Sequence, residues 1–305
     1  MLKLVILIIY FAVLIGIGLY CRKHATDVNG FVLGGRSVGP WLTAFAYGTS
    51  YFSAVVFVGY AGQFGWKYGI AATWAGIGNA IIGSLLAWVV LGRRTRIMSQ
   101  HLDSATMPQY FGKRFGSNPL KIGASVIIFI FLIPYTASLY NGLSRLFGMA
   151  FNIDYSVCII IMATLTAIYV IAGGYMATAI NDFIQGIIML FGIVAVIAAV
   201  IHSKGGFMSA LQGLANVSDP AVSKTPGIFA SFFGPDPFNL LCVVILTSLG
   251  TWGLPQMVQK FYAIDNEASI QKGTVISTIF ALIVSGGCYF LGGFGRLFSD
   301  QIDVK

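Results

Sequence analysis

The sequence predicts an all-α membrane protein, a polytopic bundle of transmembrane helices. Of its 305 residues, 57% are hydrophobic and 9% are charged, whereas about a quarter of the residues in a soluble domain are charged. The apolar residues are gathered in runs of about 20, the length at which a helix crosses the hydrocarbon core of a bilayer. A helix also satisfies its backbone polar groups within the segment, as lipid requires. We therefore expect the lipid bilayer to be the solvent of most of the chain.

Eight apolar runs follow one another along the chain, which we expect to be a single transmembrane domain over residues 1–305. Our limits for the runs are 3–20, 41–66, 70–92, 121–147, 155–172, 180–201, 238–258 and 272–295. The first run ends at Tyr20 and Cys21, and the bulky Tyr20 does not fit the small-residue cleavage site of a secretory signal. We therefore predict that this run is a retained helix. Residues 202–237, rich in Gly and Pro, are expected to form an external loop.

The net charge of +8 does not predict a nucleic-acid partner, because the Lys and Arg residues lie between apolar runs and not on one basic face. We interpret them as loop charges that set the orientation of the protein, with both termini outside and the basic segment 93–121 inside. Within that segment, residues 107–115 mix aromatic and basic side chains. They suit either a short helix at the cytoplasmic interface or a solvated basic loop.

The sequence contains no pattern typical of an enzyme or of a transition-metal site. The four cysteines are far apart and lack Cys-x-x-Cys spacing, and the three histidines fall in separate loops. A phosphate-binding loop, a nucleophile elbow and a His-Glu-x-x-His motif are all missing from the sequence. We therefore expect a protein that is not an enzyme and that uses no organic cofactor.

Two of the expected spans carry small and polar residues at mid-depth, at residues 45–53 and 246–256. In the second, Pro255 lacks the amide hydrogen that a helix needs, and Gly250 and Gly253 favour local unwinding. Unwound backbone is tolerated in lipid where it lines a cavity or an ion, and paired interrupted helices mark the midplane site of many secondary transporters. The alternative is that these small residues allow close helix packing.

Asp182 is an acid next to the apolar run that follows Gly173 and Gly174. An Asp at the membrane boundary suits a helix cap, because the helix dipole stabilises it there. An acid inside a helix bundle is instead a candidate for a cation pathway or a proton relay. The residues alone leave both interpretations open.

Several motifs in order along the chain resemble the sodium:solute symporter family. They are Phe31–Trp41, the interrupted span at 45–53, Thr106-Met107-Pro108, Arg114-Phe115, the segment 173–185 and Trp252-Gly253-Leu254. The resemblance implies the leucine-transporter-type fold, in which two inverted five-helix repeats follow one extra helix. Here the extra helix would be 3–20, the first repeat 41–201 and the start of the second repeat 238–295.

The resemblance also implies residue roles. The main sodium site would take the backbone carbonyls of Thr49 and Phe52, with Ser53 beside them, and Asp182 would belong to a second sodium site or to the release path. Tyr51, Asn79 and Trp252 would line the substrate pocket if they face the cavity, although aromatic residues in a bundle also serve as packing.

Two departures from the family pattern bear on the expected function. The resemblance implies three further core helices, one of them with hydroxyl ligands of the same sodium site, whereas this sequence ends at Lys305; we expect an incomplete second repeat. The apolar stretch Ala54–Phe57 and the absence of Lys between Gly273 and Phe294 disfavour a sugar as the solute. An acid stands at the position of Tyr51 in proline-type relatives, which also weakens proline. An amino acid, an organic carboxylate and a vitamin-like precursor remain open.

We therefore predict a sodium-coupled symporter that imports a small organic solute across the plasma membrane by alternating access, with sodium as the coupling ion. One alternative is a truncated, non-transporting remnant or a regulatory partner of a complete transporter. Another is a membrane-embedded enzyme, for which Asp182 would be the one acid available and without an evident partner.

Overall fold

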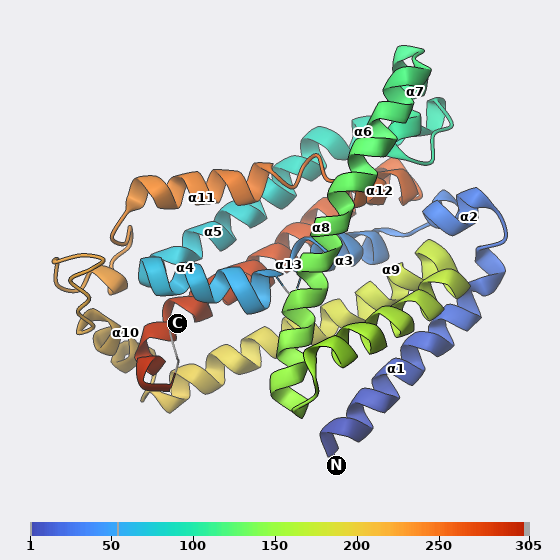
Figure 1. The fold of residues 1–305 in the computed structure, drawn as a ribbon. Coiled ribbons are helices and arrows are strands. Elements are labelled where there is room, and N and C mark those ends of the chain that lie inside the picture. Colours follow the sequence, from blue (N-terminus) through green and yellow to red (C-terminus); the bar gives the residue numbers. More distant parts are fainter. Residues whose placement is uncertain (1, 54, 302–305) are drawn as a thin grey trace. The chain divides into compact units, whose positions relative to one another are not determined.

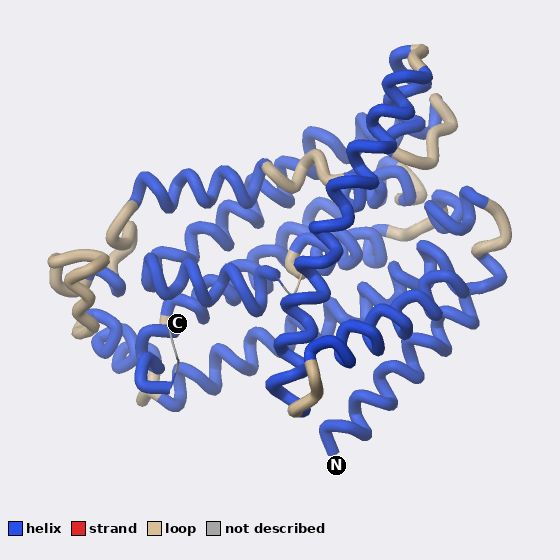
Figure 2. The backbone as a smooth tube through the Cα atoms, viewed as in Figure 1, coloured by secondary structure: helices blue, strands red, loops and turns tan. Residues whose placement is uncertain are grey.

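The computed structural model describes residues 2–53 and 55–301, and these residues form helices connected by turns and loops (Figure 1, Figure 2). The α-helices are α1 (Leu2–Cys21), α2 (Val28–Leu33), α3 (Pro40–Tyr51), α4 (Ala61–Tyr68), α5 (Thr73–Gly78), α6 (Arg93–His101), α7 (Met107–Phe115), α8 (Asn118–Phe151), α9 (Tyr155–Ser203), α10 (Phe207–Ala215), α11 (Pro237–Leu249), α12 (Pro255–Ala263) and α13 (Glu267–Gly293). Within the described residues there are two isolated β-bridges and no named strand. The prediction of an all-α fold is confirmed.

Four described helical stretches are long and apolar enough to cross a membrane: Val55–His101, Asn118–Gly148, Tyr155–Ser203 and Glu267–Gly293. Val5–Cys21 and Pro237–Leu249 are shorter apolar helices. The expected spans 155–172 and 180–201 both lie within α9. The loop that these limits imply between them, at 173–179, is therefore wrong. In its place there is a bend at Gly174, which has a positive φ of 57°. A Cβ atom at Gly174 would lie 2.8 Å from the Phe31 carbonyl oxygen, so this bend requires glycine.

Both interruptions predicted from the sequence are confirmed. α3 ends at Tyr51, and the helix resumes at Val55 in wide turns that lead into α4; Ala54, between them, lies outside the described residues. α11 ends at Leu249 and α12 begins at Pro255, where the missing amide hydrogen is harmless because the first turn of a helix leaves its amides unpaired. The chain divides into two compact units, and two of the boundaries between them fall at these interruptions.

The first unit comprises Met1–Tyr51, Trp88–Gly186 and Gly253–Ile276. Its core is a cluster of buried side chains from α2, the α6–α7 connection, α9 and α12, with a further residue, Val38, just before α3. The cluster consists of Leu33, Val38, Ala105, Tyr175, Ala179, Val258, Tyr262 and Ala263. Beside it, the ring of Tyr47 on α3 contacts those of Trp88 and Phe261, each at a centroid distance of 5.6 Å. These contacts hold α12 against α3 in this unit.

The second unit comprises Phe52–Ala87, Ile187–Trp252 and Ser277–Lys305. In this unit α11 packs beside α5, as Figure 1 shows. α4 and α13 also cross closely. A Cβ atom on Gly65 would lie 2.0 Å from the backbone of Gly292, so the crossing has no room for a side chain at Gly65. The segment expected as a Gly- and Pro-rich loop, 202–237, contains the helix α10 as well as turns.

The basic segment 93–121 folds into α6 and α7. At the start of α7 the Thr106 hydroxyl accepts a hydrogen bond from the Gln109 amide, which is the contact that an N-cap residue makes. At its end Gly116 adopts the left-handed conformation that commonly terminates a helix. Residues 107–115 therefore form the predicted short helix and not a loop, and the position of this helix at the cytoplasmic interface stays a prediction.

Not all of the basic residues are loop charges. Arg96, Lys260 and Arg296 are each at most 6% exposed, so the interpretation of these three as charges that set orientation is wrong. The guanidinium of Arg96 donates hydrogen bonds to the carbonyls of Ile264 at 2.6 Å and Asp265 at 2.9 Å. A guanidinium can satisfy several carbonyls at once, so Arg96 ties α6 to the α12–α13 connection.

Candidate functional site

Asp182 lies inside α9, about two turns beyond the bend at Gly174. A residue at this position cannot cap the first amides of the helix, which begin at the bend. The capping interpretation is therefore wrong. The carboxylate belongs to the interior of the first unit, where the side chain is 22% exposed.

The partner of Asp182 is Lys260, on the restarted helix α12. The Lys260 Nζ atom lies 3.6 Å from Asp182 Oδ2, and the Lys260 side chain is 8% exposed. The ammonium also lies over the ring of Tyr175, at 5.0 Å from its centroid. The expectation that Asp182 has no partner is therefore wrong. Sequence reasoning missed Lys260 because the expected span ended at 258, whereas the helix that restarts at Pro255 continues to Ala263.

Thr49, on the last turn of α3, is the second polar side chain at Asp182. Its side chain lies near the Asp182 carboxylate, and its hydroxyl donates a hydrogen bond to the Phe45 carbonyl at 2.9 Å. Two of the residues predicted for sodium binding, Thr49 and Asp182, are thus brought together by α3 and α9. Their roles in sodium binding stay predictions.

A cavity of about 400 Å³ adjoins this pair. It is lined by Phe31, Val32, Ser50, Tyr169, Val170, Gly174, Tyr175, Thr178, Asp182, Gln259 and Lys260. At the wall of the cavity, the Gln259 amide donates a hydrogen bond to the Val32 carbonyl at 2.7 Å. The cavity can hold several waters at about 30 Å³ each. Hard cations such as sodium take oxygen ligands, which the carboxylate of Asp182 and the hydroxyls of Ser50 and Thr178 could supply.

Phe52 and Ser53, the other residues predicted for sodium binding, lie in the gap between α3 and the turns that begin at Val55. The Ser53 carbonyl accepts hydrogen bonds from the amides of Val56 at 3.0 Å and Phe57 at 3.2 Å. It therefore serves to restart the helix. The chain passes from the first unit to the second between Tyr51 and Phe52, and a sodium-binding role for Phe52 and Ser53 stays a prediction.

Asn79, predicted to bind substrate, is fully buried in the second unit. Its side-chain oxygen accepts hydrogen bonds from the hydroxyls of Thr247 and Ser248, each at 3.1 Å, and its amide nitrogen donates to the Ser285 hydroxyl at 3.3 Å. These bonds connect Asn79 to α11 and α13. The structure thus gives Asn79 a role in joining helices, and its role toward a substrate stays a prediction.

Tyr51 and Trp252 also make contacts within their own units. The ring of Tyr51 meets that of Tyr47 edge-on, at a centroid distance of 6.3 Å. The indole of Trp252 donates a hydrogen bond to the Ile82 carbonyl at 3.0 Å. Such contacts are those of packing residues, and the substrate-binding role predicted for both also stays a prediction.

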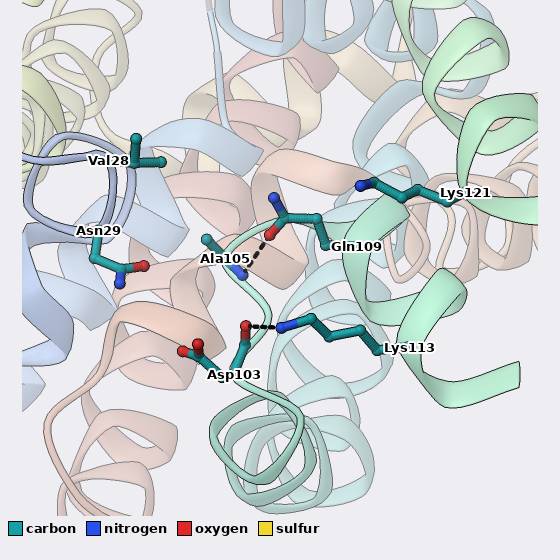
Figure 3. Close-up of a pocket in the computed structure, with 7 residues that line it drawn as sticks. All are labelled: Val28, Asn29, Asp103, Ala105, Gln109, Lys113 and Lys121. Carbon is teal, nitrogen blue, oxygen red and sulfur yellow. Dashed lines mark hydrogen bonds between the residues drawn. The ribbon is translucent and has the colours of Figure 1, made fainter. Parts of the chain in front are cut away.

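A second cavity, of about 280 Å³, lies among α2, the α6–α7 connection, α7 and the start of α8 (Figure 3). The Lys113 ammonium donates a hydrogen bond to the backbone carbonyl of Asp103 at 2.6 Å, and the Gln109 side chain accepts one from the Ala105 amide at 3.0 Å. Figure 3 shows both bonds closing the connection between α6 and α7. The charged groups here are exposed and stabilise a turn, unlike the buried pair of Asp182 and Lys260.

The chain is similar to curated transporters along nearly its whole length. It is 29% identical over 299 residues to the osmoregulated proline transporter OpuE of Bacillus subtilis (strain 168), a match that covers 97% of this chain and 59% of that protein. It is 30% identical over 311 residues to a sodium/proline symporter of Staphylococcus aureus (strain JH9), covering 99% of this chain and 57% of that protein. The chain therefore spans less than two thirds of the length of these relatives.

A solved structure described as the substrate-bound outward-open state of a Na+-coupled sialic acid symporter has a TM-score of 0.75 and 17% identity, with 100% of this chain and 63% of that chain covered. This likeness shows the fold, a bundle of helices. The model of the sodium:solute symporter family matches residues 31–300. Members of the family are multi-pass plasma-membrane transporters and not enzymes. The chain belongs to the sodium:solute symporter family.

Proposed function

We propose that this protein is a sodium-coupled symporter that imports a small organic solute by alternating access. The observation that carries the proposal is the pair of interrupted helices, α3 with its break before Val55 and α11 with its break before Pro255, in a chain of this family. Interrupted helices offer unwound carbonyls to sodium and helix ends to the substrate. The proposal includes two inverted repeats, with the first over 41–201 and the start of the second over 238–295.

We assign the sodium-binding role to Thr49, Phe52, Ser53 and Asp182. The contact between Thr49 and Asp182 supports this assignment, because it sets a hydroxyl and a carboxylate side by side at the end of a broken helix. Sodium would drive the cycle through its different affinity for the outward-open and inward-open states, since a ligand shifts an equilibrium by its differential affinity.

For the solute we infer a small organic acid, and an amino acid in particular. Two of the similar transporters are named for proline and the similar structure for sialic acid, and both of these compounds carry a carboxylate. Tyr51, in place of the acid of proline-type relatives, argues for a solute other than proline itself. Tyr51, Asn79 and Trp252 are the residues that we propose to test for solute selectivity.

Uptake into liposomes that contain the purified protein tests the proposed function. Radiolabelled proline, other amino acids and sialic acid are offered under an inward sodium gradient or an equal potassium gradient, with glucose as a solute without a carboxylate. We expect sodium-dependent accumulation of at least one carboxylate solute and none of glucose. Equal accumulation under both gradients, or accumulation of none of the carboxylates, would contradict the proposal.

The variant Asp182→Asn sharpens the uptake experiment. Removing the charge of Asp182 should raise the sodium concentration needed for half-maximal uptake, because a carboxylate favours a cation. The matched control is Asp103→Asn, in which an exposed acid of the α6–α7 connection is changed in the same way. An unchanged sodium dependence in Asp182→Asn would remove Asp182 from the sodium pathway.

A further inference from the structure

The ion pair between Asp182 and Lys260 is mostly buried but loosely joined. Its nitrogen–oxygen distance is 3.6 Å, whereas charge-assisted hydrogen bonds between such groups are about 2.7–2.9 Å long. Within the described part of the chain the ammonium also lies over the face of the Tyr175 ring, which attracts a cation without fixing its direction. The attraction between the two groups is thus mainly that of their charges, with little directional restraint.

Lys260 has room to leave the carboxylate. Both members of the pair line the cavity of about 400 Å³, together with hydroxyl-bearing side chains. A lysine ammonium is a compact point charge on a flexible stem of four carbons. It can therefore move into this polar space and stay solvated, which an ammonium enclosed by apolar side chains could not do.

The ammonium and a sodium ion would compete for Asp182. Two cations within a few ångströms of each other repel more strongly inside a protein than in bulk water. The carboxylate of Asp182 and the hydroxyl of Thr49 lie together, so a cation entering beside them would meet the charge of Lys260. One carboxylate neutralises one of the two cations, and the other one must withdraw.

We propose that Lys260 is a tethered cation that neutralises Asp182 while sodium is absent and leaves the carboxylate when sodium binds there. The inference rests on the proposed function and names the residue that would set the sodium affinity of this site. Lys260 is carried by α12, the helix that follows the second interruption. The exchange would therefore link occupancy of the ion site to the position of one half of a broken helix.

Sodium-dependent thermal stabilisation of the purified chain in detergent gives the first test. Sodium is titrated against potassium at constant ionic strength, because a ligand that binds the folded state raises its apparent stability. In Lys260→Met the sodium concentration for half-maximal stabilisation should fall about tenfold, since the competing charge is gone. In Asp182→Asn/Lys260→Met the effect of sodium at this site should be lost. The control, Lys272→Met, removes an exposed lysine and should titrate like the wild type.

The second test needs no variant and so holds even if Lys260→Met fails to fold. The wild-type chain is treated with a small amine-reactive reagent in sodium or in potassium, and the modification of each lysine is measured by mass spectrometry. Release from Asp182 should raise the modification of Lys260 several-fold in sodium, whereas that of the exposed Lys272 should be the same in both salts. Equal or lower modification of Lys260 in sodium would overturn the proposal.

The outcomes separate this inference from the proposed function. A wild type that responds specifically to sodium, with the same half-maximal concentration in Lys260→Met, would leave the sodium-coupled function standing and overturn the role of Lys260. A lack of any sodium-specific response in the wild type and in Lys260→Met would overturn both. A lower half-maximal concentration in Lys260→Met, together with the rise in modification, would support both.

Discussion

The two units of the molecule each contain a buried cation paired with an acid, and the two pairs are built differently. In the first unit Lys260 lies 3.6 Å from Asp182, beside a cavity. In the second, Arg296 lies 3.0 Å from Asp219 and donates a hydrogen bond to its carboxylate. Both cations are almost completely buried, so the difference lies in how many contacts hold each one in place.

Arg296 is held from several directions. Its Nε atom donates a hydrogen bond to the Trp66 carbonyl at 2.5 Å, and its guanidinium carbon lies 3.8 Å from the centroid of Phe229 and 4.8 Å from that of Trp66. A planar guanidinium between rings, with directional hydrogen bonds, has little freedom to move. Arg296 thus fixes the segment after α13 to α4 and to the loop that contains Asp219 and Phe229.

The comparison shows that burial of a charge does not by itself indicate its role. Several directional contacts, as at the Nε and Nη1 atoms of Arg296, are typical of a residue that holds the fold together. A long ion pair and one ring contact beside a polar cavity, as at Lys260, restrain the charge less. The two pairs thus differ in the number of directional contacts and not in the burial of the cation.

The largest effect on stability is expected from breaking the loose pair. Asp182→Asn removes the partner of the Lys260 ammonium and should cost about 3 kcal/mol, the lower end of the range for removing one member of a buried pair, because Asp182 is 22% exposed and the ammonium can move into the adjoining cavity. Asp182→Asn/Lys260→Met removes both charges and should recover most of this loss. The free energy of unfolding in detergent, measured by denaturant titration, gives both values.

A matched control fixes the scale of this prediction. Asp103→Asn changes an exposed acid and should alter the free energy of unfolding by no more than about 0.5 kcal/mol. If Asp182→Asn were as mild as Asp103→Asn, the pair would not be a buried one, and the contrast with Arg296 would lose its basis.

A smaller effect is expected at Arg296 when the planar guanidinium is replaced and the positive charge is kept. Arg296→Lys loses the hydrogen bond from Nε to the Trp66 carbonyl and the stacking of a planar group on Phe229, at a cost of about 1–3 kcal/mol. Thermal and denaturant unfolding measure the loss, with Lys272→Arg as the control for an exposed exchange between the same two residue types. A neutral Arg296→Lys would show that charge alone holds this segment.

The sequence predicted the helix breaks because their causes are local. Pro255, Gly250 and Gly253 change the backbone preferences of their own segment, so the gap between α11 and α12 could be expected from residue types alone. The bend at Gly174 was harder to predict, because two adjacent glycines suit a loop as well as a bend of one residue. The close approach of Phe31, which is distant in sequence, accompanies that bend.

The partners of the polar residues were not predictable in the same way. The apolar pattern ends before Lys260 and so indicates a loop there, whereas α12 continues and brings Lys260 to Asp182. Asn79 is predicted to line the substrate pocket, and the sequence does not show that hydroxyls of α11 and α13 satisfy its amide. Both outcomes depend on contacts between segments far apart in the chain, which periodicity does not encode.

The smallest expected effect is the pH dependence of the ion pair between Arg296 and Asp219. The hydrogen bond from Arg296 holds the pKa of the Asp219 carboxyl below its ordinary value of 3.8. An acid with a lowered pKa in the folded state adds stability that is fully present above the unfolded pKa and is lost as the pH falls through the folded one. The stability that the ion pair between Arg296 and Asp219 contributes should therefore fall as the pH drops below 3.8.

Thermal unfolding of the wild type and of Asp219→Asn between about pH 6 and pH 3 measures this dependence. The difference in melting temperature between the two should be constant at the upper end and should shrink at the lower end, where the wild-type carboxyl becomes protonated. Asp300→Asn, at an exposed acid of the same segment as Arg296, is the control and should show no such convergence. A difference between the wild type and Asp219→Asn that stays constant down to pH 3 would mean that the charge of Asp219 adds nothing to the stability of the fold. The hydrogen bond to Trp66 and the two aromatic rings would then suffice to hold Arg296, and directional contacts without a charged partner would be enough to fix a buried cation.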